Sequence, residues 1–244
     1  MKNLVVSACA VSGLAFALVG CGPSITSPDM AKTEEGAVCG PDGLIDDGED
    51  GNNQVIVHTG RAGYIYTYMD PEGTTISPKA GSEGGVFAMS AGGHNSGYAM
   101  RMNGTVANAK IVYAGMGLNM TDPKDMYDAT QYKGISFWAK RGPGASNVVR
   151  VKMPDVNTDP DGGLCGNCYN DFGLDIKLNE EWTQYIIPFG KMKQEPGWGN
   201  PRPGSLAVDK VFALQFQVKK PGPYDVWVDD IAFSGCTGGT PAAK

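Results

Sequence analysis

Short runs in which hydrophobic and polar residues alternate, each bounded by a cluster of Gly, Pro, Asn or Asp, recur along most of this chain. The pattern is typical of short β-strands joined by tight turns. No stretch of useful length has helical periodicity, although 123–132 has room for one turn of helix. Many short strands separated by turns predict an all-β fold in which two antiparallel sheets pack face to face, as a β-sandwich or jelly roll. We expect strands at 55–58, 64–69, 86–90, 98–102, 110–118, 134–140, 148–153, 182–188, 211–218 and 225–233.

Composition and charge indicate a folded protein and exclude some kinds of binding partner. Of the 244 residues, 35 are Gly and 16 are Pro, a combined share below the roughly 25–30% at which disorder becomes the default, so we expect a folded, turn-rich protein. The net charge is −6, and no run of Lys or Arg is longer than a pair. Such a chain has no way to neutralise a row of phosphates, which excludes nucleic acid as a partner. With only His58 and His94 present, a His-rich metal centre is excluded too.

The N-terminus predicts export. Residues 1–20 are one Lys followed by a mostly apolar stretch, which is typical of a signal peptide and too short and broken for a membrane span. The four residues 18–21, Leu-Val-Gly-Cys, resemble the bacterial lipobox, in which the Cys is lipidated and the signal is cleaved before it. That resemblance implies a lipid anchor on Cys21 and a place in the bacterial cell envelope, at the outer membrane. The alternative is an ordinary secretory signal with a chance Cys.

Three further segments follow the signal peptide. Residues 21–38 read as the lipidated Cys and a flexible tether, because the segment after Cys21 is polar, small and aperiodic. Residues 39–236 carry all the expected strands and read as one domain, and 237–244 as a loose tail.

Cys9 lies in the predicted signal peptide and Cys21 is the predicted lipidation site, so four cysteines remain. In an oxidising compartment they allow three pairings. We favour one disulfide between Cys39 and Cys236, which would join the two ends of the domain, and a second between Cys165 and Cys168 within one loop. The rival is a zinc site that uses Cys165 and Cys168 as half of its ligands.

Period-two alternation assigns side chains to faces. In 134–140, Ile135 and Phe137 share one face, and Ser136, Trp138 and Lys140 share the other. The segments 149–153 and 214–218 repeat the pattern. If the three strands lie in one sheet, its outer face is polar with an aromatic platform, made of Ser136, Trp138, Arg150, Lys152, Gln215 and Gln217.

Four segments in order, GISFWAKR at 134–141, VRVKMPD at 149–155, EWTQYIIPF at 181–189 and YDVWVDDIAF at 224–233, resemble the carbohydrate-binding jelly rolls of the galactose-binding-like superfold. Within that group the chain looks most like family-eleven-like carbohydrate-binding modules, whose acidic opening segment is similar to LIDDGEDGNNQ at 44–54. The resemblance implies non-catalytic binding of polysaccharide by a monomeric module. It also implies a structural calcium ion between the opening segment and the last strand, held by Asp47, Glu49, Asp50, Asp229 and Asp230. The alternative is that these acids form a solvated surface cluster.

Sugars are held by aromatic rings against their C–H faces and by planar polar side chains that bond neighbouring hydroxyls. Tyr64, Tyr66 and Tyr68 alternate, so their rings project from one face of a strand. The alternative is that these tyrosines line an edge of the core, and that the tryptophans pack rather than bind. The candidate ligand-binding residues are Tyr64, Tyr66, Tyr68, Trp138, Arg150, Trp198, Gln215 and Gln217.

Two other functions stay open at this point. A glycoside hydrolase acting on polysaccharide is the first, because an acidic chain always offers pairs of carboxylates. A structural or adhesion lipoprotein that binds another protein is the second. We expect no enzyme, because the acids cluster in loops and no GxSxG, HExxH or phosphate-loop motif is present.

Overall fold

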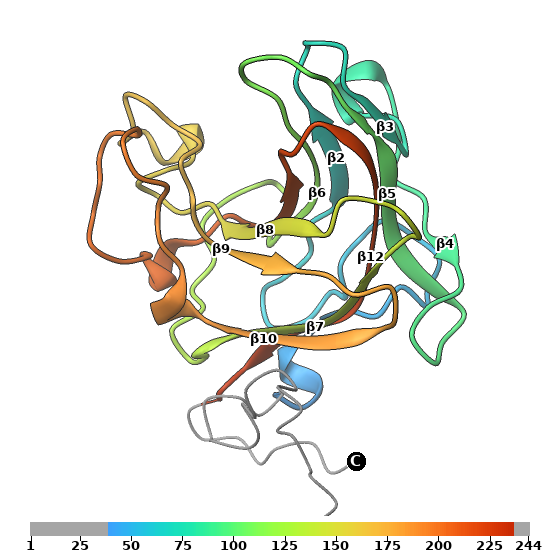
Figure 1. Cartoon of the computed structure of the whole chain (residues 1–244). Coiled ribbons are helices and arrows are strands. Elements are labelled where there is room, and N and C mark those ends of the chain that lie inside the picture. The colour runs from blue at the N-terminus through green and yellow to red at the C-terminus, as the bar shows by residue number, and fades with distance from the viewer. Residues whose placement is uncertain (1–38, 237–244) are drawn as a thin grey trace, which may run out of the picture. The chain divides into compact units, whose positions relative to one another are not determined.

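The computed structural model describes residues 39–236, which form two antiparallel β-sheets in separate layers (Figure 1). The five-stranded sheet has the order β2 (Ile65–Met69), β6 (Ala114–Asn119), β11 (Ala213–Val218), β8 (Val148–Met153) and β9 (Phe172–Lys177). The path of the seven-stranded sheet is β10 (Thr183–Pro188), β7 (Gly134–Arg141), β12 (Gly222–Ser234), β5 (Tyr98–Val106) and β3 (Thr75–Ser77). Its other two strands are β1 (Leu44–Asp46), which pairs with β12, and β4 (Ser90–Ala91), which pairs with β5. The predicted two-sheet, all-β sandwich is confirmed.

Helix is confined to single 3-10 turns in the connections between described strands. No helix forms in 123–132, where the sequence left room for one turn. No helix within residues 39–236 has the length and apolar character needed to span a membrane. The 3-10 turns are η2 (Pro41–Gly43), η3 (Gly81–Glu83), η4 (Pro160–Gly162), η5 (Phe189–Lys191) and η6 (Val208–Lys210).

Side chains from the facing sides of the two sheets build the core. Phe137 of β7 and Phe216 of β11 come from different sheets, and their ring centroids lie 5.0 Å apart in an edge-to-face arrangement. The period-two assignment holds on each strand, since Ile135, Val151 and Leu214 are also fully buried. Alternation therefore predicts correctly which side of each strand faces inward.

The two predicted disulfides are present. Cys39 pairs with Cys236, with Cα atoms 5.7 Å apart, and Cys165 pairs with Cys168. The first joins the two ends of the described chain, where the backbone N–H of Cys39 also donates to the carbonyl of Phe233. These pairings remove the cysteines that a zinc site would have used.

The structure differs from the expected strands at several places. Residues 55–58 make isolated bridges only, and most of 86–90 is irregular. The sequence reading missed β1, β3 and β9. The first two have three residues each, too few for alternation to be visible, and β9 contains Gly173 and Asp175, residue types that strands disfavour.

The assumption that three polar-faced strands share a sheet is wrong. Strands β8 and β11 are neighbours in the five-stranded sheet, but β7 belongs to the seven-stranded sheet. Trp138 and Ser136 therefore lie on the opposite side of the sandwich from Arg150 and Gln215. Local periodicity reports the face of a strand but not the sheet that receives it.

Candidate functional site

A cavity of about 1120 Å³ lies against the outer face of the five-stranded sheet. Its floor comes from alternate residues of β2, β8 and β11, and its walls come from the connections at 107–113, 154–171 and 193–198. Six of the eight predicted ligand-binding residues line it: Tyr66, Tyr68, Arg150, Trp198, Gln215 and Gln217.

The floor is set out in rows across the sheet. In one row Tyr66 pairs with Gly117, Gly117 with Gln215, and Gln215 with Lys152. The next row has the same order, Tyr68, Gly115, Gln217 and Arg150. Each row therefore carries an aromatic ring, a glycine, an amide and a cation on adjacent strands.

The glycines of β6 leave room for the tyrosine rings to lie over the sheet. A Cβ atom on Gly115 would lie 2.3 Å from Cζ of Tyr68, and one on Gly117 would lie 2.9 Å from the Tyr66 hydroxyl. The amide of Gln215 then joins the two rings, because its Nε2 donates to the Tyr66 hydroxyl at 2.7 Å and its Oε1 accepts from the Tyr68 hydroxyl at 3.2 Å. The two rings are thus held in fixed positions on the floor.

The phenols of Tyr66 and Tyr68 are neutral at physiological pH, as an unperturbed tyrosine is. Burial raises the pKa of both well above the ordinary value for tyrosine. A neutral phenol presents an apolar face and a hydroxyl that can both donate and accept. This is the combination that suits a ligand with C–H faces and hydroxyl edges.

Further aromatic side chains stand along the walls. Tyr113 lies 6.1 Å from Tyr68 between ring centroids. Tyr169 is 66% exposed and Trp198 is 37% exposed, and both line the cavity. Tyr169 has a φ of 72°, a left-handed conformation that costs a non-glycine residue of the order of 1–3 kcal/mol. The sequence reading missed Tyr113 and Tyr169, since neither takes part in the 64–68 alternation.

A network in the loops positions Trp198. Asn170 is buried, and its Nδ2 donates to the Trp198 carbonyl at 2.6 Å while its Oδ1 accepts from the Glu195 backbone N–H at 2.8 Å. Gly199 follows at a φ of 87°, and a Cβ atom there would lie 2.8 Å from the Asn170 Cβ. The Gly-rich sequence around Trp198 therefore allows close packing against Asn170.

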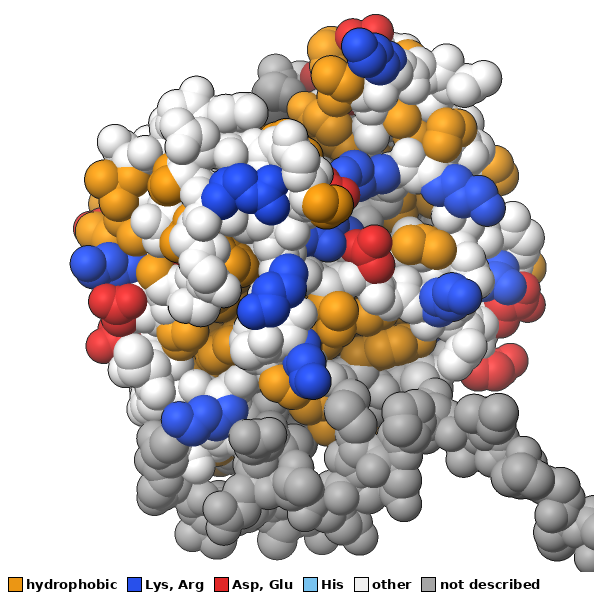
Figure 2. All heavy atoms as spheres, turned by 60° about the vertical axis from the view of Figure 1, so that its left-hand side comes forward, with side chains coloured by type: hydrophobic (Ala, Val, Ile, Leu, Met, Phe, Trp, Pro, Cys, Tyr) orange, Lys and Arg blue, Asp and Glu red, His pale blue; other side chains and the backbone are white. Residues whose placement is uncertain are grey.

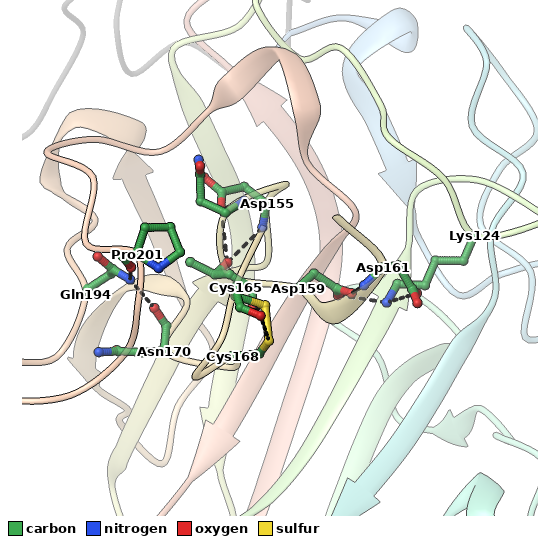
Figure 3. The surroundings of a disulfide bond; sticks show 11 residues. Lys124, Asp155, Asp159, Asp161, Cys165, Cys168, Asn170, Gln194 and Pro201 are labelled. Atoms are coloured by element: carbon green, nitrogen blue, oxygen red, sulfur yellow. Dashed lines mark hydrogen bonds and ion pairs between the residues drawn. A yellow bond between two sulfur atoms is a disulfide. The ribbon is translucent and has the colours of Figure 1, made fainter. Parts of the chain in front are cut away.

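The Cys165–Cys168 disulfide lies within the same group of loops (Figure 3). Next to it, the buried carboxylate of Asp155 accepts from the backbone N–H of Ala207 at 2.8 Å, which joins the two long connections. Burial raises the pKa of Asp155, although the hydrogen bonds that it accepts oppose the shift. The cavity walls are thus fixed by a disulfide and buried polar bonds.

Each carboxylate that lines the cavity is paired with a cation. Lys124 Nζ lies 2.7 Å from Asp159 and 2.9 Å from Asp161, and Lys219 bonds both oxygens of Glu195. Burial lowers the pKa of Lys124, but these two carboxylates outweigh it and raise the pKa overall. Other pairs are Arg150 with Asp175 and Lys152 with Asp171. Figure 2 turns the 154–206 connections forward and shows Lys and Arg scattered among hydrophobic side chains rather than gathered in one block.

Two predicted ligand-binding residues lie outside the cavity. Tyr64 precedes β2 and is 41% exposed, but it is not among the lining residues. Trp138 lies on the seven-stranded sheet, where it stacks on His94 with ring centroids 3.7 Å apart. One face of the Trp138 ring is therefore already covered by the protein's own imidazole.

The acidic residues expected to hold calcium make hydrogen bonds to the protein instead. Glu49 accepts from the backbone N–H groups of Gly97 and Tyr98, and Asp229 from that of His94. Asp47 and Asp50 accept from residues two positions along, and Asp230 bonds the His94 ring. Residues 39–236 contain no group of three or more His, Cys, Asp or Glu side chains placed to hold a metal ion. This arrangement does not by itself show the expected site, and calcium stays a prediction.

Asp46, which the sequence reading did not select, is the most perturbed carboxyl at this acidic segment. It is 3% exposed, and burial raises its pKa to about 7. The nearby carboxylates of Asp50, Asp47 and Asp229 raise it further, while the Gly48 N–H opposes them. The acidic residues therefore do cluster, and the buried carboxyl of Asp46 is at the centre of the cluster.

Comparison with known families decides the class. The model of the family "Carbohydrate binding domain 30" matches residues 79–235, well over half of the chain. The chain belongs to this family. The matched segment holds the cavity residues of β8 and β11 and Trp198, whereas the β2 residues Tyr66 and Tyr68 precede it.

Solved structures of carbohydrate-binding modules share the fold. A family 11 module from Clostridium thermocellum, in complex with a β-1,3-1,4-mixed-linked tetrasaccharide, is 19% identical with a TM-score of 0.56, and the match covers 80% of this chain and 95% of that one. The family 11 module of the cellulosomal cellulase Lic26A-Cel5E of the same organism is 18% identical with a TM-score of 0.52, covering 70% and 88%. No curated protein matches the chain. The resemblance to a carbohydrate-binding jelly roll is confirmed, with family 30 as the matching family.

Proposed function

We propose that the domain binds an extended polysaccharide in the cavity on the five-stranded sheet and does not cleave it. The observation that carries the proposal is the convergence of aromatic rings and planar polar groups in one cavity. Tyr66 and Tyr68 on the floor and Trp198 on the wall supply apolar faces, and Gln217 and Arg150 supply hydrogen bonds. Membership of a carbohydrate-binding family supports the same function.

Mixed-linked β-glucan is the first ligand to test. The family 11 module that shares the fold was solved with a β-1,3-1,4-mixed-linked tetrasaccharide. The cavity, at about 1120 Å³, exceeds the roughly 300–1000 Å³ of a site for one small molecule, which suits several sugar units.

The carboxylates of the cavity favour binding over hydrolysis. A glycosidase needs a carboxylic acid that keeps its proton near neutral pH. Here Asp159, Asp171 and Glu195 are each paired with a lysine. Burial raises the pKa of Glu195, but its bonds with Lys219 outweigh burial and lower it overall. A group held in its charged form is a poor general acid.

The test is calorimetric titration of 39–236 with the tetrasaccharide, together with an assay for reducing ends released from mixed-linked β-glucan. We expect binding without release. Trp198→Ala should weaken binding about tenfold, since a ring–sugar contact is lost. Trp138→Phe, on the opposite sheet, is the matched control and should leave the affinity within twofold. Release of reducing ends by the wild type, or equal losses in both variants, would contradict the proposal.

We also propose that the protein is a lipid-anchored envelope protein, with the lipid on Cys21. Support comes from the sequence alone, because residues 1–38 and 237–244 lie outside the described residues. Two or more acyl chains hold a protein stably on a membrane. Cys21→Ser should move the expressed protein from the membrane fraction to the soluble fraction, as measured by fractionation and by mass analysis of the N-terminal peptide. Retention of Cys21→Ser in the membrane, or an unmodified Cys21, would contradict lipidation.

A further inference from the structure

Lys152 and Asp171 form a buried ion pair in the cavity lining. Lys152 Nζ lies 2.7 Å from Asp171 Oδ2, and the two side chains are 6% and 2% exposed. Lys152 belongs to β8, and Asp171 immediately precedes β9. The inference drawn from this pair rests on the proposed function, because it concerns the same cavity.

Both members of the pair have hydrogen-bonding groups that the bond between them does not use. An ammonium group has three N–H donors, and the bond to Asp171 takes one of them. The other carboxylate oxygen, Asp171 Oδ1, is buried and finds no donor within residues 39–236. A buried polar atom without a partner is costly and calls for an explanation.

The free oxygen of Asp171 and the free N–H donors of Lys152 define which ligand groups can bind here. Oδ1 needs a hydrogen-bond donor, and the ammonium beside it needs an acceptor. A hydroxyl group can do either, so two neighbouring hydroxyls on one sugar ring satisfy both at once. A carboxylate or an ester carbonyl has no hydrogen to give and would repel Oδ1.

The position of the pair suits a sugar held on Tyr68. Lys152 Nζ lies 5.9 Å from the centroid of the Tyr68 ring. A sugar whose C–H face rests on that ring turns its hydroxyl edge outward, toward groups beside the ring. The pair would therefore meet the edge of a sugar whose face is already supported.

We propose that Lys152 and Asp171 act together as a clamp for two neighbouring sugar hydroxyls. Lys152 donates to the oxygen of one hydroxyl, and Asp171 Oδ1 accepts the hydrogen of the next. The ion pair holds the carboxylate in place so that Oδ1 stays fixed for the ligand. Selectivity at this point depends on hydroxyl position, because an analogue without either hydroxyl leaves a buried group unpaired.

The test variant is Lys152→Met with Asp171→Leu. Removing one partner alone would leave a buried charge unpaired and destabilise the fold, whereas replacing both with apolar residues of similar volume is often neutral for stability. The matched control is Lys210→Met with Asp209→Leu, which removes an exposed pair outside the cavity lining. Asp171→Asn is a conservative second variant, because its amide oxygen can still accept from Lys152 Nζ while the amide nitrogen in place of Oδ1 cannot accept from a sugar hydroxyl.

Titration uses the β-1,3-1,4-mixed-linked tetrasaccharide and its monodeoxy derivatives. We expect the double variant at 152 and 171 to melt within a few degrees of the wild type and to bind at least tenfold more weakly, with the control pair unchanged. In the wild type, removal of one of two adjacent hydroxyls should cost at least tenfold, and that preference should vanish in the double variant. If the double variant does not fold, titration of Asp171→Asn with the same derivatives should show the loss of preference for the two adjacent hydroxyls.

The outcomes separate the clamp from the proposed function. A double variant that binds as tightly as the wild type, or a wild type indifferent to every deoxy position, overturns the clamp while glycan binding stands. A folded wild type that binds neither the tetrasaccharide nor any other glycan overturns both.

Discussion

Tyr68→Ala should reduce the affinity for the mixed-linked tetrasaccharide by roughly 100-fold, an effect typical of a central aromatic residue in a binding site. The ring of Tyr68 lies on Gly115, its hydroxyl bonds Gln215, and it is 6.1 Å from the rings of both Tyr66 and Tyr113. Its loss removes one stacking face and frees the neighbours that it holds. Calorimetric titration measures the affinity.

Tyr64→Ala is the matched control for this prediction. Tyr64 is on the same face of the same segment, but it does not line the cavity. We expect its replacement to leave the affinity for the tetrasaccharide within twofold. Equal losses at positions 64 and 68 would mean that the ligand lies along the segment 64–68 rather than in the cavity.

Asp46→Asn should stabilise the domain at pH 8 in the presence of EDTA. The pKa of Asp46 is raised from 3.8 to about 7, chiefly by burial. The stability that this carboxyl contributes is therefore fully present below about pH 4 and is lost as the pH rises to about 7, opposite to the usual behaviour of Asp. One pKa unit corresponds to 1.36 kcal/mol, so the loss is of the order of 4 kcal/mol. Asp46→Asn avoids this loss of stability, because an amide stays neutral at pH 8. The amide oxygen can still accept from the Gly48 N–H.

Urea unfolding at pH 4, 6 and 8 measures this effect. The difference in free energy of unfolding between Asp46→Asn and the wild type should grow from pH 4 to pH 8. Asp128→Asn is the control, because hydrogen bonds from Thr130 lower the pKa of that exposed carboxyl, and its loss should not stabilise the domain at pH 8. A pH-independent difference at position 46 would contradict the prediction.

The same series, repeated with calcium in place of EDTA, tests the metal prediction. A cation beside Asp46 would favour its charged form and remove the stability loss between pH 4 and pH 7. Calcium binding would thus appear as a higher unfolding midpoint at pH 8 in the wild type. Identical curves with calcium and with EDTA would instead favour the solvated acidic cluster.

Alternation and turn signals were enough to predict the two-sheet, all-β fold. Ile135, Phe137 and Phe216 face the core as expected, and both disulfides form as favoured. Strands β1 and β3 escaped because the alternation signal needs length, and β9 escaped because Gly173 and Asp175 interrupt its strand-forming residues.

The sequence was enough to select many of the side chains of the site, but not to predict which sheet or connection contains each of them. Tyr66, Gln215 and Trp198 were selected from side-chain chemistry, and they do line one cavity. Trp138 was misplaced because its assignment required knowing which sheet contains β7, and that depends on long-range pairing. Tyr169 was missed because a connection, not a periodic strand, brings it to the cavity wall.

The covalent link between residues 39 and 236 has a mechanical consequence. A force applied through residues 1–38 enters the domain at Cys39, and the link passes part of it directly to the end of β12. Strand β12 is central in its sheet, hydrogen-bonded to both β5 and β7. The load is therefore shared among several strands instead of peeling the short β1 from its neighbour. A pull on the chain ahead of Cys39 would thus act on a point that is cross-linked next to the end of a strand with hydrogen-bonded neighbours on both sides.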